Sequence, residues 1–392
     1  MGKYDRVILL ATASLVCFGA LMIYSSTSVI TPVLAKKNIS EFYYFKRHIF
    51  TIVIGFIFLF LTYYKLKLSF VQKYATPLLI ISFVLLVLVF IPGIGVTAGG
   101  ATRWIRLWPS TFQPSELVKL SMVIYLAHYL SKSDYNPDSF TSFLKPIGIM
   151  VIFQVVILKQ PDFGAAMSLA FLTFALLFIS GTRLRYLASL ALFALPVVIM
   201  LVLKPYRLKR ITCFLDPWKE PQGCGFQLVQ SFIALGSGGM NGVGLGSSKQ
   251  KLAYLPESHT DFIFSIIGEE FGLIGVLSVI VVFLIIFLRG IAVANRAKGK
   301  FVYYLATGIT LMISLQALIN FAVAVGLVPT KGLPLPFLSY GGSSLLVNLA
   351  AVGMLLTISK GEEESSACRN HEVLIRKKAR RNVYRRYAAS GS

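Results

Sequence analysis

The chain has 392 residues, of which 56% are hydrophobic and only 14% charged, and its mean hydropathy is +0.74. Soluble domains usually carry about 25% charged residues, so this composition excludes an ordinary soluble fold and indicates a multi-span membrane protein. The formal charge of +22 would suit a nucleic-acid-binding protein, but the basic residues lie between and after apolar runs. That distribution is typical of loops that set membrane topology and contact anionic lipid. We therefore expect membrane lipids, and no nucleic acid, among the partners.

Apolar runs recur along the whole chain, and a spanning helix needs about 20 mostly apolar residues. Helices are the only open architecture that satisfies the backbone in lipid, so the sequence predicts an all-α membrane bundle of about ten spans. No small-residue cleavage site follows the first apolar run, which is therefore expected to stay as a helix. The spans are expected near residues 7–28, 48–64, 74–91, 115–131, 144–158, 163–181, 184–204, 261–289, 301–327 and 338–359.

An even number of spans places both termini on one side of the membrane. Lys and Arg favour the cytoplasmic side once the loop 204–260 is set aside, because long loops translocate largely regardless of charge. Residues 1–360 are thus expected to form one polytopic domain with outer loops near 92–114 and 204–260. Residues 361–392 contain the run RKKARR, which predicts a basic, disordered cytoplasmic tail.

The first outer loop and the fourth span carry charges that a membrane segment tolerates poorly. Arg103 lies in the loop, Ser115 is a candidate N-cap of the fourth span, and Glu116 then falls in the first helical turn, where the helix dipole favours it. Lys119 lies one turn deeper on the same face, so we expect it to pair with Glu116. A buried pair needs further partners, and Asp261 could supply one.

Asp162, in the string QPDFG, precedes the sixth span and suits an N-cap and a site residue about equally. The loop 204–260 is basic, and Arg210 and Lys249 are among the side chains that together suit an anionic, lipid-linked substrate. No Gly-Lys-Ser/Thr follows its glycine-dense segment, which argues against nucleotide binding. A short interfacial helix is expected at residues 231–235 of this loop.

The same loop contains Cys213 and Cys224, two of the four cysteines in the chain. The four show no metal-ligand spacing. Cys213 and Cys224 can pair if the loop faces an oxidising compartment.

Acidic residues collect where the eighth span begins, in LPESHTDFIFSIIGEEFG, although only 16 Asp and Glu occur in the chain. If Arg289 marks the inner boundary of a straight helix, a hydrocarbon core of about 30 Å ends near Glu269 and Glu270. Asp261 would then lie about 12 Å higher, at the level of the lipid headgroups. We therefore expect Asp261 to carry the chemistry and Glu269 to support it or to pack.

The last outer loop, VPTKGLPLPFLSYGGSS at residues 328–344, is rich in proline and glycine. Irregular backbone at membrane depth is tolerated where it lines a cavity. Ser339 and Ser343 are the candidate substrate-binding hydroxyls of this loop.

Several strings occur in one order across residues 7–359: ATRWI, QPSELVKL, QPDFG, RLKRITCFLDPW, QLVQSFIALGSGG, LPESHTDFIFSIIGEEFG and GLPLPFLSYGGSS. Together they resemble the SEDS family of bacterial membrane proteins. RITCFLDPW and SKQKLAYLPESHTDF are more similar to its division-type branch, whereas GLPLPF leans towards its elongation-type branch. Cys213, Cys224 and the extended basic tail depart from the family pattern.

The resemblance implies an enzyme that polymerises peptidoglycan from lipid II at the outer face of the cytoplasmic (inner) membrane. The family's essential acid corresponds to Asp261, its charged pair to Glu116 and Lys119, and its PDFG-type acid to Asp162. A class B penicillin-binding protein transpeptidase and other divisome membrane proteins are the implied partners, at the division septum. A divalent cation, Mg²⁺ or Mn²⁺, is compatible with this function, and no residue set predicts a metal site.

On this interpretation Asp261 acts as general base in glycosyl transfer, and Arg103, Arg210 or Lys249 stabilises the pyrophosphate that leaves. A lipid II flippase or other transporter is the alternative from another class, and it predicts polar residues through the full depth of the bilayer. The polar residues instead cluster at the outer ends of the spans. An elongation-type polymerase and a scaffold that only recruits the transpeptidase are the remaining alternatives.

Overall fold

The computed structural model describes residues 5–27, 42–98, 100–107, 110–203, 205–251, 255, 259–330 and 332–361. The tail predicted at 361–392 therefore lies outside the described residues apart from Gly361. The expected spans coincide with helices, except that the span expected at 261–289 is divided at Gly272 and is not one continuous helix. The helices are α1 (Arg6–Thr27), α3 (Tyr43–Lys65), α4 (Leu68–Lys73), α5 (Ala75–Leu88), α6 (Pro114–Leu130), α7 (Phe140–Lys159), α8 (Phe163–Ile179), α9 (Leu184–Val202), α12 (Ile263–Arg296), α13 (Lys300–Ala324) and a final helix, Gly342–Gly361.

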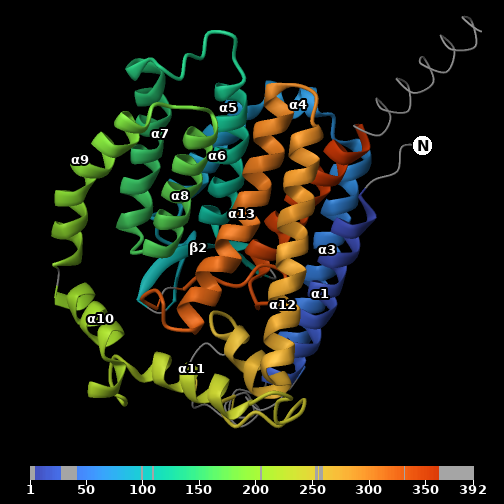
Figure 1. Cartoon of the computed structure of the whole chain (residues 1–392), viewed down its shortest axis with the longest axis vertical. Coiled ribbons are helices and arrows are strands. Elements are labelled where there is room, and N and C mark those ends of the chain that lie inside the picture. Colours follow the sequence, from blue (N-terminus) through green and yellow to red (C-terminus); the bar gives the residue numbers. More distant parts are fainter. Residues whose placement is uncertain are drawn as a thin grey trace, which may run out of the picture.

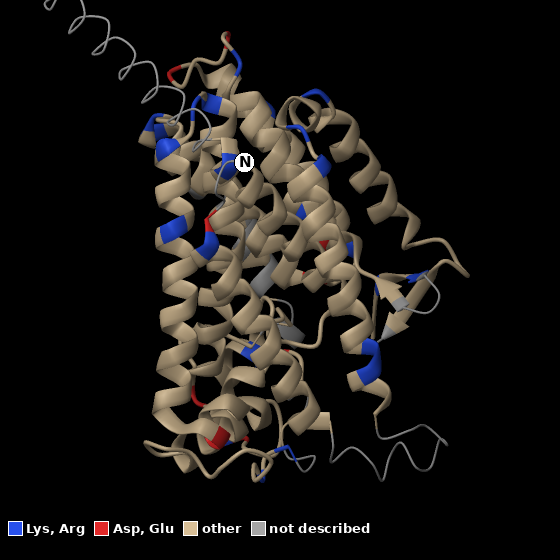
Figure 2. Cartoon of the chain, turned by 90° about the vertical axis from the view of Figure 1, so that its right-hand side faces the viewer, with Lys and Arg blue, Asp and Glu red and all other residues tan. Residues whose placement is uncertain are grey.

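The helices form one elongated bundle, and its outer surface is apolar, as contact with lipid requires. Six of the described helices are long and apolar enough to cross a membrane: α1, α3, α7, α12, α13 and the final helix. Large apolar side chains are exposed along their outward faces, for example Phe50 on α3 and Leu284 on α12. Most of the charged residues gather towards the two ends of the bundle (Figure 2). The prediction of an all-α membrane bundle is confirmed.

The two ends of the bundle differ in construction (Figure 1). The N-terminal face is the end where α1 begins, and there Arg289 of α12 donates a 2.9 Å hydrogen bond from Nε to Asp5 Oδ2. The loop face is the opposite end and carries α10 (Pro205–Leu215), the 3-10 turn Pro217–Lys219 and α11 (Phe226–Ser237). The short helix expected at 231–235 is part of the longer α11.

The connection at 92–114, expected as an outer loop, contains a small sheet. Strands β1 (Gly95–Ala98), β2 (Ala101–Leu107) and β3 (Ser110–Phe112) pair antiparallel in the order β1-β2-β3. The β-branched and aromatic residues of TRWIRL favour a half-buried strand, with Ile105 buried. Since β3 leads directly into α6, the sheet sets the position at which that helix begins.

Helix α12 is broken, and the chain reverses direction inside it. Gly272 has φ 64° and ψ −160°, which are not helical angles. Ile267 would touch a Cβ placed on Gly275, and Val276 would touch one on Gly268. Residues eight positions apart in a straight helix are separated by about 12 Å. Residues 263–271 therefore pack back against the start of residues 273–296 as a helical hairpin.

Aromatic contacts confirm the reversal further from the turn. The ring of Phe321 on α13 lies 4.5 Å from Phe264 and 5.6 Å from Phe283, measured between centroids. In a straight helix Phe264 and Phe283 would be about 28 Å apart. The expected depths are therefore wrong in order: Glu269 and Glu270 lie at the tip of the hairpin, on the loop face, and Asp261 lies deeper in the bundle.

The hairpin reverses at Gly272 because the backbone of the 238–244 segment presses against it. A Cβ on Gly272 would come within 2.4 Å of the Met240 carbonyl oxygen. Backbone hydrogen bonds join the same segments, from Leu273 N to Gly239 O at 2.9 Å and from Gly244 N to Glu270 O at 3.0 Å. The glycine-dense part of the loop thus has a structural purpose, which is close backbone approach at the hairpin tip.

Replacing Gly272 by Ala should destabilise the fold by about 1–3 kcal/mol from backbone strain alone, because its conformation is disfavoured for any residue with a Cβ. The clash with Met240 adds to this. Thermal unfolding of the detergent-solubilised protein measures the change. Gly148→Ala is the matched control, since Gly148 lies exposed within α7 with no atom within 4 Å of the new Cβ. The reversal is not required for stability if both variants unfold at the wild-type temperature.

Candidate active site

The predicted pair of Glu116 and Lys119 is confirmed. Lys119 Nζ lies 2.8 Å from Glu116 Oε1, and the two side chains are 2% and 3% exposed. A third group, Gln316 of α13, accepts a 2.6 Å hydrogen bond from Lys119 Nζ. A neutral amide thus supplies one of the further partners that the buried pair needs.

Gln316 and Asn320 connect this pair to the segment that carries Asp261. Gln316 Nε2 donates to the Pro334 carbonyl at 2.8 Å. One turn further along α13, Asn320 Nδ2 donates to the carbonyl oxygens of Asp261 at 2.8 Å and Leu333 at 2.9 Å. The two amides thus hold the last outer loop and the backbone of Asp261 against one face of α13.

Asp261 lies just before the first segment of α12, and its side chain is partly exposed. A Cβ added to Gly332 would lie 3.2 Å from Asp261 Oδ2, so the carboxylate rests against the backbone of the last outer loop. A side chain at position 332 would require the carboxylate to shift by a few tenths of an ångström. The result is a carboxylate fixed by its backbone, with one side against protein and part of its surface accessible.

Asp162 and Arg103 meet on the opposite edge of the same loop. Asp162 caps α8 by accepting from Ala165 N at 3.1 Å, and it also accepts from Gln113 Nε2 at 3.0 Å. Arg103 of β2 donates to the carbonyls of Gln160 at 3.2 Å and Pro161 at 2.6 Å. Arg103 therefore clamps the turn between α7 and α8 beside Asp162.

The two candidate serines of the last outer loop already have partners. Ser343 Oγ accepts from Gln113 N at 2.8 Å, which joins the final helix to the start of α6. Ser339 Oγ accepts from Leu335 N at 2.8 Å and closes a turn within the loop. Both hydroxyls therefore hold the backbone of the last outer loop, which forms a wall beside Asp261 at Gly332.

An aromatic group forms the rest of this wall. The rings of Tyr340, His259 and Tyr44 all contact one another, with centroids 5.6 to 5.8 Å apart. The backbone N of Tyr340 donates to the His259 carbonyl at 2.9 Å. Burial raises the pKa of the Tyr340 phenol, so at neutral pH this group stays protonated.

Three other candidates lie away from Asp261. Arg210 is exposed on α10, at the edge of the loop face (Figure 1). Glu269 is buried at the hairpin tip, where it accepts from Ser248 Oγ and from Lys249 N at 2.9 Å. The side chain of Lys249 is exposed. The sequence identified these three residues as candidates, but it did not show that the fold places them away from Asp261.

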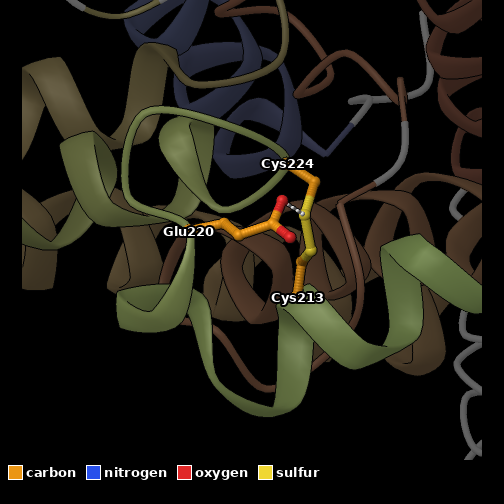
Figure 3. A group of neighbouring side chains, drawn as sticks. All are labelled: Cys213, Glu220 and Cys224. Atoms are coloured by element: carbon orange, nitrogen blue, oxygen red, sulfur yellow. Dashed lines mark hydrogen bonds between the residues drawn. A yellow bond between two sulfur atoms is a disulfide. The ribbon is translucent and has the colours of Figure 1, made fainter.

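Cys213 and Cys224 form a disulfide that ties α10 to the turn before α11, with Cα atoms 5.9 Å apart (Figure 3). Glu220 lies beside them, and the three make up the group of potential metal ligands found among the described residues. Cysteine binds a metal as the thiolate, and neither sulfur of a disulfide is a thiolate. Asp261 is not part of this group.

Sequence reasoning missed Gln316 and Asn320, although the signal was present. Both are polar, they are four positions apart, and they interrupt an otherwise apolar span, so they share one helix face. The predicted N-cap at Ser115 was wrong, because α6 begins at Pro114 and Gln113 is the capping residue. Proline suits the first helical position since its missing N–H would be unpaired there in any case.

The chain is similar to known proteins over most of its length. Residues 5–364 match a family described as cell cycle protein, FtsW/RodA/SpoVE. A probable peptidoglycan glycosyltransferase FtsW of Geobacter sp. (strain M18) is 46% identical over 91% of this chain and 96% of its own length. One from Escherichia coli O6:H1 is 41% identical over 91% and 86%.

Two solved structures are similar over nearly the whole chain. One, from work on structural coordination of polymerization and crosslinking by a peptidoglycan synthase complex, has a TM-score of 0.74 and 28% identity, covering 92% of this chain and 98% of its own. The rod shape determining protein RodA of Thermus thermophilus has a TM-score of 0.67 and 27% identity, covering 91% and 97%.

Replacing Lys119 by Met should lower the free energy of unfolding by about 3–5 kcal/mol, because it leaves the Glu116 carboxylate buried without its cation. The double variant Glu116→Gln/Lys119→Met removes both charges and should lose clearly less. Thermal unfolding of the two purified variants makes the comparison. If both variants lose the same free energy of unfolding, the buried Glu116 carboxylate does not depend on Lys119.

Proposed function

Since the chain belongs to the FtsW/RodA/SpoVE family of cell cycle proteins, we propose that it is a peptidoglycan glycosyltransferase that polymerises lipid II at the outer face of the cytoplasmic membrane. The observation that carries this proposal is the placement of Asp261. Its partly exposed carboxylate lies against Gly332 of the last outer loop, and its backbone is held by Asn320. The Glu116–Lys119 pair supports the same α13 face through Gln316.

In the proposed reaction Asp261 removes the proton from the 4-hydroxyl of the acceptor sugar. The resulting oxygen attacks the anomeric carbon of the donor and forms the new glycosidic bond. The bond from that carbon to the pyrophosphate oxygen breaks, and undecaprenyl pyrophosphate leaves with its electron pair. Asp261 then returns its proton to solvent. A general base of this kind typically contributes 10²–10⁴-fold.

The departing pyrophosphate needs positive charge at the place where its own charge develops. Arg103 is the best supported candidate, because it is fixed beside Asp162 on the edge of the last outer loop. Arg210 and Lys249 would serve earlier, by attracting the anionic headgroup to the loop face. Ser339 and Ser343 would act by shaping the sugar-binding wall, since their hydroxyls already hold the backbone.

Among the described residues, Asp261 is not one of three or more His, Cys, Asp or Glu side chains close enough to share an ion. Mg²⁺ takes most of its ligands from waters and phosphates, so Mg²⁺ or Mn²⁺ would depend on the substrate's own pyrophosphate. No step of the proposed reaction passes through a metal.

The proposal extends to partners and location. A class B penicillin-binding protein would crosslink the strands that this enzyme makes, within a complex of other divisome proteins. This is supported by the similarity to a structure described as a peptidoglycan synthase complex. We place both termini in the cytoplasm, which puts the Cys213–Cys224 disulfide in the oxidising outer compartment.

Purified Asp261→Asn, combined with its transpeptidase partner and fluorescent lipid II, should form glycan strands at least 100-fold more slowly than wild type, because the amide cannot accept the hydroxyl proton. Gel separation of the labelled strands measures the rate. Asp261→Asn with wild-type rate would refute the assignment of the general base.

The same preparations distinguish the rivals. In liposomes, transfer of labelled lipid II across the bilayer without polymer would favour a flippase. Growth of cells that carry only Asp261→Ala would favour a scaffold. A polymerase predicts neither result.

A fluorescent fusion of the full chain should concentrate at the division septum, because its curated relatives at 46% and 41% identity carry the FtsW name. Microscopy of dividing rod-shaped cells makes the measurement. Signal spread along the side wall would instead assign the protein to elongation.

A further inference from the structure

A buried ion pair closes the part of the chain that carries Asp261. Lys251 Nζ lies 3.0 Å from Glu270 Oε1, and the two side chains are 2% and 0% exposed. Ser25, near the end of α1, donates to the two carboxylate oxygens of Glu270 at 2.7 and 2.9 Å and accepts from Lys251 Nζ at 3.1 Å. We call Ser25, Lys251 and Glu270 the clasp.

The ion pair of the clasp joins two positions that lie on either side of Asp261 in the sequence. Lys251 precedes Asp261 and Glu270 follows it, so the ion pair closes residues 251–270 into one loop with Asp261 near its middle. The second half of this loop is the rigid helical segment before Gly272. A shift of the clasped end is therefore transmitted along that segment to Asp261.

Other bonds hold the same tip without the clasp. Glu269 accepts from Ser248 Oγ and from Lys249 N at 2.9 Å, and Val243 N donates to the Glu269 carbonyl at 2.9 Å. The hairpin is thus attached to the loop by several contacts. Removal of the ion pair should leave the fold in place while allowing the segment to shift or rotate.

A charged pair is a poor way to gain stability in such a buried place, because desolvation offsets the attraction and an apolar pair of similar size often does as well. What a hydrogen-bonded ion pair provides is one preferred geometry. Resting on the proposed function, we propose that Ser25, Lys251 and Glu270 are positioning residues that set the depth and orientation of Asp261 for glycosyl transfer.

The test uses the full chain with its transpeptidase partner and fluorescent lipid II. The double variant Lys251→Met/Glu270→Leu removes both charges and keeps apolar volume, so its unfolding temperature should stay within about 3 °C of wild type. The KM for lipid II should change by less than about twofold, while kcat should fall by about 10–100-fold, because misplacement of a catalytic group by about 1 Å can cost 10²-fold.

The matched control is Arg183→Met/Asp138→Asn, which removes an exposed ion pair between the α6–α7 and α8–α9 connections. It should keep the wild-type kcat and KM. A clasp variant with unchanged kcat would overturn the proposal, and so would a loss of kcat that is accompanied by an equal loss of folded protein.

Asp261→Asn measured in parallel separates the two proposals. If Asp261→Asn is inactive and the clasp variant keeps full kcat, only the positioning function of the clasp is refuted. If Asp261→Asn polymerises normally, both fall, because the clasp then has no base to position.

Discussion

The structure depends on the reversal of the chain at Gly272. A helix that continued straight would place Asp261 beyond the end of the bundle, whereas the hairpin returns it to the interior against α13. The reversal requires a residue without a side chain, because the Met240 backbone occupies the space of a Cβ. The glycine-dense loop and the two adjacent acids of the hairpin tip follow from this one constraint.

Around the hairpin, buried polar groups are arranged in connected networks and not as isolated charges. Lys119 is satisfied by Glu116 and Gln316, and Lys251 by Glu270 and Ser25. Single buried charges are costly, and each network satisfies most of its donors and acceptors. Both networks end on segments that bear on Asp261, one through α13 and the other through the hairpin. The two buried ion pairs thus help to hold the Asp261 carboxylate in place.

Most of the fold follows from composition and periodicity. Apolar runs of about 20 residues leave a membrane helix as their only stable form, and the expected spans coincide with helices except 261–289, which the reversal at Gly272 divides. The pair of Glu116 and Lys119 was predictable for a similar reason, since three positions along a helix bring two side chains together whatever surrounds them. The cap at Asp162 is equally local. The resemblance of the strings to a known family, and not the periodicity, is the basis for the role proposed for Asp261.

The sequence by itself determined the membrane bundle, the helix positions and the local pairs, because these depend on hydrophobicity and short-range geometry. Only the tertiary structure decided depth and convergence. One φ angle at Gly272 reversed the order of Asp261 and Glu270 across the membrane, and no pattern of hydrophobicity marks such a turn. Likewise, Gln316, Asn320 and Gly332 come together with Asp261 through contacts between separate helices and loops. Those contacts depend on packing between segments that are far apart in the chain.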